Sequence, residues 1–185
     1  MAQTTKTDNS YLADKVALRV KHLPPGEVSV LDCFAGRGLV WECVRRMTSQ
    51  KITRLAIDKM ADGFYLPGDN RAYLPILDLT AFNVIDLDAY GVPYEQLQQV
   101  FERNYSGRVF VTCIQVFYGA MPHGLLRELG FSDALLDKAS ILCSKRGWRL
   151  FCDWLAMHGV TEIVHRSHAR NHYLTFFCGK PEGTN

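Results

Sequence analysis

The sequence predicts an α/β domain in which helices cover both faces of a mostly parallel sheet. Short apolar runs rich in β-branched residues alternate along the chain with stretches of helical periodicity, which is typical of parallel sheets. The last two apolar runs are separated only by a short turn-like stretch, which indicates an antiparallel closing pair. Because the chain has 185 residues, 48% of them hydrophobic, we expect one domain with a sizeable core.

The expected elements follow one another with little chain to spare. The first is a helix over residues 11–23, which the stretch Pro24-Pro25-Gly26 ends. The pattern then predicts strands over 28–33, 54–57, 73–77, 82–87, 108–117, 161–167 and 172–179, and helices over 39–47, 93–101 and 147–158. Residues 119–146 carry no clear pattern. Together these elements predict a doubly wound, mostly parallel seven-stranded sheet with an antiparallel last strand.

Residues 1–10 are polar and are expected to form a flexible leader ahead of a single domain over residues 11–185. No run is apolar and long enough for a signal peptide or a bilayer span, so we expect no membrane partner. The six cysteines include no C-x-x-C pair, and this indicates buried thiols in a reducing, cytoplasmic compartment rather than disulfides or a metal site.

The charge of the chain is nearly balanced. Its formal net charge of +2 neither requires nor excludes a nucleic-acid partner. One local group of cations stands near the end of the chain, where His165, Arg166, His168, Arg170 and His172 fit either a phosphate-contacting rim or a solvated hairpin. Strand alternation spreads these side chains over two faces, which argues against a metal site.

The stretch SVLDCFAGRGLVWE, residues 29–42, runs from an apolar strand through an acid and two glycines into an amphipathic helix. In doubly wound sheets such a turn lets a ligand approach the backbone at a helix N-terminus, and Asp58 ends the next strand, where an acid can accept both ribose hydroxyls of an adenosine. Trp41 occupies the place of the third glycine of dinucleotide sites. Asp32 would repel a pyrophosphate but attract a sulfonium, so S-adenosylmethionine fits better than NAD.

Residues 31–38, LDCFAGRG, match the first motif LDxFAGxG of the class I S-adenosylmethionine-dependent methyltransferases, and the chain resembles that family over nearly its whole length. The resemblance implies the doubly wound, Rossmann-like fold of the family. It also implies that the cofactor contacts a set of nine residues: Asp32, Gly36 and Gly38 at the methionine end, Asp58 at the ribose, Asp78 and Leu79 at the adenine, and Phe34, Ala35 and Lys59 as further cofactor contacts. From the residues alone, Asp78 fits equally well as the N-cap of a following helix.

Residues 84–93, VIDLDAYGVP, lie where amino-methyltransferases carry an acid, small or proline residues and an aromatic. The stretch resembles the DLDPFGSP motif of tRNA guanine-N2 dimethyltransferases, and Val111-Thr112-Cys113 with Tyr118-Gly119 faintly resembles their TATD and CG residues. Ala89 and Gln115 depart from that pattern, and the chain has no room for the family's RNA-binding extension, so the resemblance favours the reaction type over a particular substrate.

The implied catalytic residues are Asp88 and Tyr90. An exocyclic amine would donate to Asp88, and Tyr90 would stack on an unpaired base or, alternatively, serve only as a packed aromatic. Asp86 is expected to point toward the other end or face of the sheet and to form structural hydrogen bonds. A covalent route through Cys113 is disfavoured, because the fourth-strand loop offers no second thiol.

The sequence therefore predicts an S-adenosylmethionine-dependent methyltransferase that acts on an amino nitrogen of a nucleic-acid base, RNA or DNA. Two alternatives stay open: a catalytically silent domain that binds the cofactor or nucleic acid as a regulator, and a methyltransferase for small molecules or proteins. Because the chain has little room for a target-recognition module, a protein partner is expected to supply one.

Overall fold

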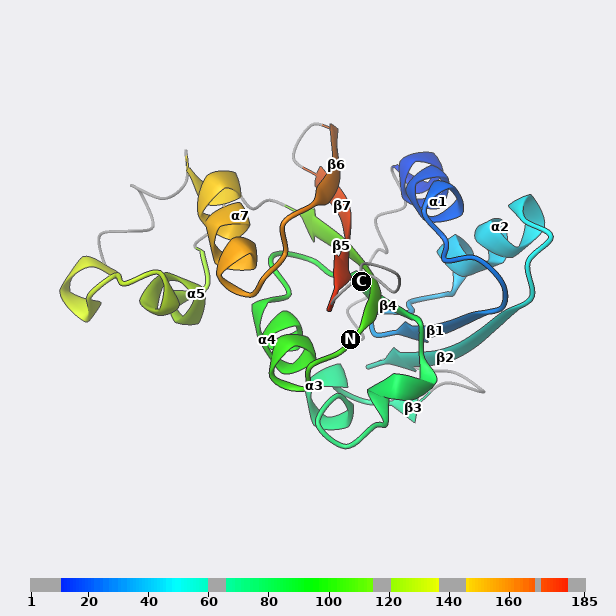
Figure 1. Ribbon diagram of the computed structural model, residues 1–185, viewed down its shortest axis with the longest axis horizontal. Helices are drawn as coiled ribbons and strands as arrows, with labels where there is room; N and C mark the ends of the chain where they lie inside the picture. The colour runs from blue at the N-terminus through cyan, green and yellow to red at the C-terminus, as the bar shows by residue number, and fades with distance from the viewer. Residues whose placement is uncertain (1–10, 60–65, 115–120, 137–145, 169–170, 180–185) are drawn as a thin grey trace, which may run out of the picture.

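The computed structural model describes residues 11–59, 66–114, 121–136, 146–168 and 171–179, so the expected leader over residues 1–10 lies outside the described part. Within these residues, seven strands form one sheet in the order β3-β2-β1-β4-β5-β7-β6 (Figure 1). The strands are β1 (Val28–Asp32), β2 (Ile52–Asp58), β3 (Leu66–Pro67), β4 (Val84–Asp88), β5 (Gly107–Ile114), β6 (Ile163–His168) and β7 (Asn171–Cys178).

The pairing of the strands confirms the predicted sheet. From β3 across to β5, neighbouring strands pair in parallel, whereas β7 runs antiparallel to both β5 and β6. The strands β1 and β4 are neighbours, although β2 and β3 lie between them in the chain. The loops after β1 and β4 therefore diverge at the carboxyl edge of the sheet, which is the switch point where doubly wound sheets bind ligands.

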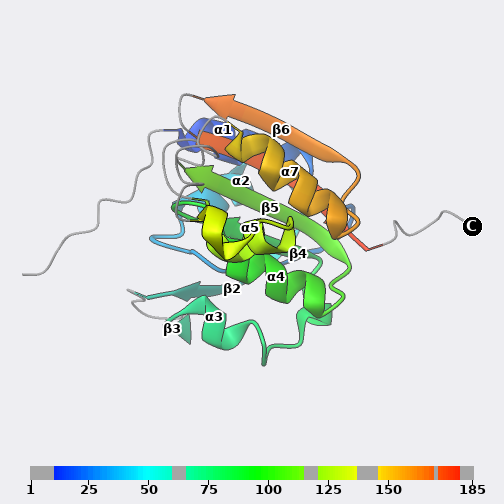
Figure 2. The ribbon, with the colours of Figure 1, turned by 90° about the vertical axis from the view of Figure 1, so that its left-hand side faces the viewer.

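Helices cover both faces of the sheet, as predicted (Figures 1 and 2). On one face lie α1 (Leu12–Lys21) and α2 (Leu39–Met47), and on the other α4 (Tyr94–Glu102), α5 (His123–Glu128) and α7 (Gly147–Met157). Two short helical turns, α3 (Asn70–Tyr73) and η1 (Leu79–Ala81), connect β3 to β4. The helix α5 falls in the stretch 119–146 that carried no clear pattern.

Each face has its own apolar core. On the α1 and α2 side, Trp41, Val44 and Phe110 are fully buried. On the other side, Leu97 of α4 and Trp154 of α7 pack against the inner residues of β4, β5 and β7. This sandwich leaves the carboxyl ends of β1, β2 and β4 as the place where loops, rather than helices, meet.

The predicted strand over residues 73–77 is wrong. This part of the chain follows the helical turn α3, in which the backbone N–H of Leu74 donates to the carbonyl of Asn70 at 2.9 Å. The third strand is instead the two-residue β3, at the sheet edge, where Pro67 is tolerated because an edge strand need not donate on its open side. Within the apolar run only Leu74 is buried, and Ile76 is 76% exposed, so the run is not a core strand.

The cysteines and the helices bear on two further expectations. The five described cysteines, Cys33, Cys43, Cys113, Cys152 and Cys178, are free thiols. In the described part of the chain, no helix has the length and apolar character needed to cross a membrane. A cytoplasmic location stays a prediction.

Candidate functional site

The turn between β1 and α2 is built on two glycines with left-handed backbones. Gly36 has φ 52° and Gly38 has φ 75°, a region that side chains with a Cβ rarely adopt. Hydrogen bonds from Ala35 N to the carbonyl of Ile57 at 3.1 Å and from Gly38 N to the carbonyl of Ala35 at 2.7 Å fix the turn. Gly38 is also the N-cap residue of α2, so the turn opens directly onto a helix N-terminus.

Asp58 joins this turn from the end of β2. Its Oδ2 accepts the backbone N–H of Gly36 at 2.7 Å. The structure thus brings together Asp58, Ala35 and the two glycines, four residues that the sequence predicts at one cofactor site. The carboxylate and the glycine turn stand at the same edge because β1 and β2 are parallel neighbours.

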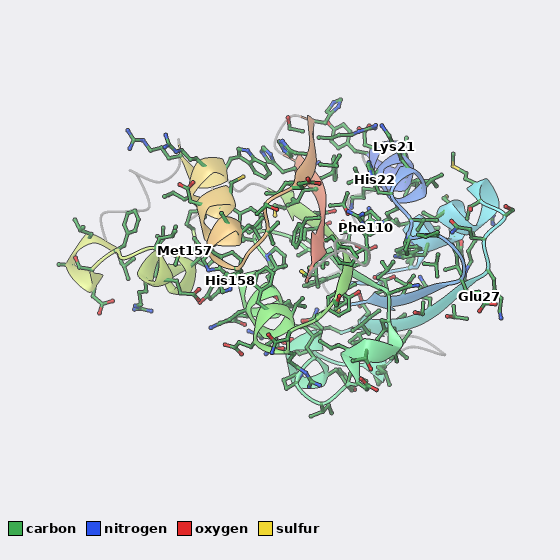
Figure 3. All side chains as sticks on the ribbon, in the orientation of Figure 1. Lys21, His22, Glu27, Phe110, Met157 and His158 are labelled. Atoms are coloured by element: carbon green, nitrogen blue, oxygen red, sulfur yellow. The ribbon has the colours of Figure 1, made fainter. Side chains whose placement is uncertain are left out.

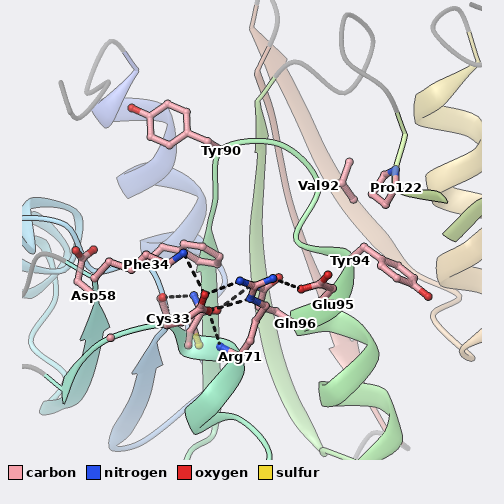
Figure 4. Close-up of a pocket in the computed structure, with 14 residues that line it drawn as sticks. Cys33, Phe34, Asp58, Arg71, Tyr90, Val92, Tyr94, Glu95, Gln96 and Pro122 are labelled. Atoms are coloured by element: carbon pink, nitrogen blue, oxygen red, sulfur yellow. Dashed lines mark hydrogen bonds and ion pairs between the residues drawn. The ribbon is translucent and has the colours of Figure 1, made fainter. Parts of the chain in front are cut away.

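A pocket of about 690 Å³ opens beside this turn (Figure 4). Loops after four strands and the start of α4 form its wall. The lining residues are Cys33 and Phe34 after β1, Asp58 at the end of β2 and Lys59 after it, the stretch 68–71 after β3, Tyr90 and Val92 after β4, then Tyr94, Glu95, Gln96 and Pro122. Four predicted site residues, Phe34, Asp58, Lys59 and Tyr90, therefore face one cavity.

Asp78 and Leu79 are not among the lining residues. The side chain of Asp78 accepts from Thr80 N at 3.0 Å and from the Thr80 hydroxyl at 2.7 Å, so it caps η1. These two hydrogen bonds lower the pKa of Asp78. Of the two roles that the sequence left open for Asp78, the structure confirms the N-cap. The contact of Asp78 and Leu79 with an adenine stays a prediction, which their place outside the pocket lining does not favour.

Asp69 stands where the sequence placed Asp78, directly after the third strand. It was missed because β3 is only two residues long, although the turn-forming stretch Gly68-Asp69-Asn70 signals the end of a strand and the start of a helix. Asp69 caps α3 by accepting from Arg71 N at 3.0 Å. It also lines the pocket.

A buried polar chain supports the floor of the pocket. Asn70 donates through Nδ2 to the carbonyl of Cys33 at 2.6 Å and accepts through Oδ1 from Gln96 Nε2 at 2.8 Å. Asn70 and Gln96 are both buried. The end of β1, α3 and α4 are therefore held in one fixed arrangement.

An ionic cluster forms the outer rim. Arg71 contacts Asp69 at 2.6 Å and Glu95 at 2.6 Å, while Lys59 contacts Asp69 at 3.1 Å. The hydrogen bonds from Arg71 lower the pKa of Asp69, so its carboxylate is ionised at neutral pH. These charges largely neutralise one another.

Asp32 does not line the pocket. Its carboxylate is buried, faces α1 and α2, and contacts Arg54 at 3.3 Å. Burial raises its pKa well above the usual range, the charge of Asp86 raises it further, and Arg54 opposes the rise. The expected contact of Asp32 with the methionine end of a cofactor stays a prediction.

Asp86 is confirmed as a structural residue, but its expected direction was wrong. Residues two apart on a strand share a face, so Asp86 and Asp88 both point toward α1. Arg19 holds Asp86 through two hydrogen bonds of 2.7 and 2.5 Å, and Trp41 Nε1 donates to it at 2.6 Å. This acid is fully engaged within the fold.

Asp88 lies at the strand end and forms an ion pair with Lys15. Lys15 Nζ is 2.8 Å from Oδ1 and 2.9 Å from Oδ2, with 14% of the Asp88 side chain exposed. Lys15 and Arg19 are one helical turn apart on α1, which matches the spacing of the two acids on β4. The loop that begins after Asp88 carries Tyr90, which is 62% exposed at the pocket rim.

The opposite wall is anchored by Glu128. Its carboxylate accepts from the hydroxyl of Tyr94 at 2.5 Å and from Trp154 Nε1 at 2.7 Å, and His158 Nε2 lies 3.1 Å away. Burial and the neighbouring Glu128 carboxylate raise the pKa of the Tyr94 phenol, so Tyr94 stays a hydrogen-bond donor. Residues of α4, α5 and α7 therefore meet at one carboxylate behind this wall.

Cys113 faces the core and is completely buried. Burial raises the pKa of its thiol, so a nucleophilic thiolate is disfavoured there. The structure thus supports the expectation that a covalent route through Cys113 is disfavoured.

Comparison with known proteins places the fold. No protein-family model and no curated protein sequence matches the chain. Among solved structures, Trm1 from Pyrococcus horikoshii in complex with S-adenosylmethionine has a TM-score of 0.60 at 15% identity, over 90% of this chain and 54% of that one. The CurJ carbon methyltransferase gives 0.53 at 14% identity, over 91% and 55% of the two chains.

A third match is the S-adenosylhomocysteine-bound methyltransferase PaMTH1 from Podospora anserina, with a TM-score of 0.50 at 14% identity, over 91% of this chain and 78% of that one. The chain therefore shares the fold of these proteins and spans little more than half the length of the Trm1 and CurJ chains.

Proposed function

We propose that this protein is an S-adenosylmethionine-dependent methyltransferase that acts on an amino nitrogen of a nucleic-acid base. The observation that carries the proposal is the Asp58 carboxylate bonded to Gly36 N at the edge of a pocket, at the switch point of the sheet. The fold shared with Trm1 and PaMTH1, which were solved with S-adenosylmethionine and S-adenosylhomocysteine, supports it.

The pocket has the size and the donors and acceptors that this cofactor needs. Its volume of about 690 Å³ lies within the range of about 300 to 1,000 Å³ that small-molecule sites span. We assign the ribose hydroxyls to Asp58, the methionine end to the turn over residues 33–38, and the adenine amine to Asp69 in place of Asp78. When bound, S-adenosylmethionine supplies an electrophilic methyl group.

The acceptor side is the wall formed by Tyr90, Val92, Tyr94 and Pro122. Tyr90 presents an exposed ring on which a base can stack, a contact worth about 1 to 3 kcal/mol. Each oxygen of a carboxylate accepts more than one hydrogen bond, so an amine can donate to Asp88 while Lys15 holds it in place. The residues thereby orient the amine and exclude water, and no strong base is required.

The test is transfer of labelled methyl groups into RNA and DNA by the wild-type chain and by Asp88→Asn. Asp88→Asn removes a charged acceptor, and a hydrogen bond to a charged group is worth about 1.5 to 3 kcal/mol. We therefore expect kcat to fall about 10- to 150-fold and the cofactor affinity to stay within twofold. Asp153→Asn on the exposed surface of α7 is the matched control and should keep full activity. Full activity of Asp88→Asn would show that the amine is oriented by another group.

The ion pair between Lys15 and Asp88 favours one second candidate, a silent domain that binds the cofactor without turnover. In that case Asp88 serves only to fix α1 on β4. Cofactor binding by the wild-type chain with no label in RNA, DNA or protein would select this candidate. Label entering protein or a small molecule alone would select the remaining alternative.

A further inference from the structure

The basic side chains near the end of the chain divide between the two faces of the sheet. His165 and His172 lie on the α7 face, where their ring nitrogens are 2.8 Å apart and Trp148 stacks on His165 at 3.9 Å between ring centroids. Arg166 and His168 lie on the α1 face, since Arg166 pairs in register with Tyr173, which packs in the core on that side.

Another cation, Arg108, lies on the same face, on β5. Arg108 pairs in register with Phe177 of β7, and its Cζ lies 5.8 Å from the centre of that ring. Its Nε is buried and has no hydrogen-bond partner among the described residues. The guanidinium is thus held in place by an aromatic ring, not by a carboxylate.

The end of α1 brings a lysine and a histidine to this place. Lys21 is the last residue of the helix and His22 is its C-cap, and Figure 3 shows both beside the sheet on the side of Phe110. Burial lowers the pKa of His22, and the positive charges of Arg108, Lys21 and Arg166 lower it further. Three elements therefore bring positive groups within electrostatic reach of one another.

Among the described residues no acid is paired with this group, which we call the basic cluster: Lys21, His22, Arg108 and Arg166. Asp14, on the same helix as Lys21, lies 3.8 Å from His168. Assembling like charges without a counter-charge is unfavourable unless an anion binds there.

We propose that the basic cluster binds the phosphodiester backbone of the nucleic-acid substrate. This rests on the proposed function and adds where the substrate is held. Arg108 lies four residues before Thr112, which pairs with Asp88, so Arg108 is about 13 Å along the strand from the Asp88 end of β4. Arg166 pairs with Tyr173, which pairs with Thr112, so the cluster extends from Arg108 toward the Asp88 edge of the sheet. An oligonucleotide of several residues can contact the cluster and present one base at Tyr90.

The expected effect follows from counterion release. Each phosphate contact of a single strand contributes about −0.7 to the slope of log K against log salt, so losing one contact should weaken binding about fivefold at 0.1 M salt. The probe is a fluorescein-labelled single-stranded RNA of mixed sequence, with DNA of the same sequence in a parallel arm, measured by anisotropy from 0.05 to 0.3 M NaCl.

Arg166→Gln and Lys21→Gln are the principal variants because both side chains are exposed, and the double variant should lose about 25-fold in affinity and about 1.4 in slope. Arg108→Gln is added to the series if this variant has the melting temperature of the wild-type chain. Arg149→Gln is the control, since it removes the same charge from an exposed position on α7, across the sheet. Arg166→Lys should retain most of the binding.

Equal losses in the Arg149→Gln control and in the cluster variants would overturn the proposal, as would an unchanged slope in the double variant. Titration with S-adenosylmethionine separates this from the proposed function. Cluster variants that keep cofactor affinity but lose RNA affinity support both the phosphodiester site and the methyltransferase assignment. A wild-type chain that binds RNA through the cluster but binds no cofactor overturns the methyltransferase assignment alone. If only the DNA arm responds to the variants, the phosphodiester source is DNA.

Discussion

Replacing Asp58 by asparagine tests the assignment of the ribose site. The amide oxygen can still accept the N–H of Gly36, which Asp58 now binds at 2.7 Å, so the glycine turn keeps its support. The amide nitrogen cannot accept a hydrogen bond from a hydroxyl, so one charge-assisted hydrogen bond to the ribose is lost. Such a bond is worth about 1.5 to 3 kcal/mol, which corresponds to a Kd for S-adenosylmethionine about 10- to 150-fold weaker.

Calorimetric titration of Asp58→Asn, with a melting curve to confirm folding, measures this change. Asp78→Asn is the matched control: it removes an acid that caps η1 and does not line the pocket, and asparagine is as good an N-cap as aspartate. Its Kd should stay within twofold of the wild-type value. A normal Kd for Asp58→Asn, or a large loss for Asp78→Asn, would refute the placement of the adenosine.

Three further predictions concern stability and substrate binding. Arg19→Met leaves Asp86 as a buried acid without its bidentate partner and should cost about 3 to 5 kcal/mol in urea unfolding, whereas a loss under 1 kcal/mol would mean that the pair contributes little. Tyr90→Ala should raise the KM for RNA about 5- to 150-fold while Tyr90→Phe keeps it; an unchanged KM in both would remove the stacking role. Burial raises the pKa of Asp32 in the folded state, so the free energy of unfolding should fall as pH rises from about 4 toward that raised pKa. Asp32→Asn should flatten this fall, which urea titrations at about pH 4.5 and 7.5 measure. A wild-type free energy of unfolding that rises between these two pH values would contradict the direction of the pKa shift.

The sequence predicted those parts of the fold that local signals specify. The helix over residues 39–47 has the predicted bounds because a glycine N-cap precedes it and an amphipathic pattern fills it. The two-residue β3 has no such signal, since a strand shows periodicity only over several residues. Because this strand was missed, the adenine contact was expected at Asp78, whereas we now propose it at Asp69, which lines the pocket.

The rest of the site depends on contacts between residues far apart in the chain. Asp58 was predicted because an acid at a strand end has a local signature, but its hydrogen bond to Gly36 depends on strand order. The Asn70–Gln96 and Lys15–Asp88 pairs carry no local signal, since they form only when α3, α4 and α1 are in place. The predicted direction of the Asp86 side chain was wrong because residues two apart on a strand, such as Asp86 and Asp88, point to the same face of the sheet.

The most direct test of the methyltransferase assignment is calorimetric titration of the wild-type chain with S-adenosylmethionine and, separately, with NAD. We expect saturable one-site binding of S-adenosylmethionine and no detectable heat with NAD. The buried Trp41 occupies the position that a dinucleotide site gives to its third glycine. Binding of NAD with no binding of S-adenosylmethionine would contradict the assignment of the glycine turn and of the pocket beside it.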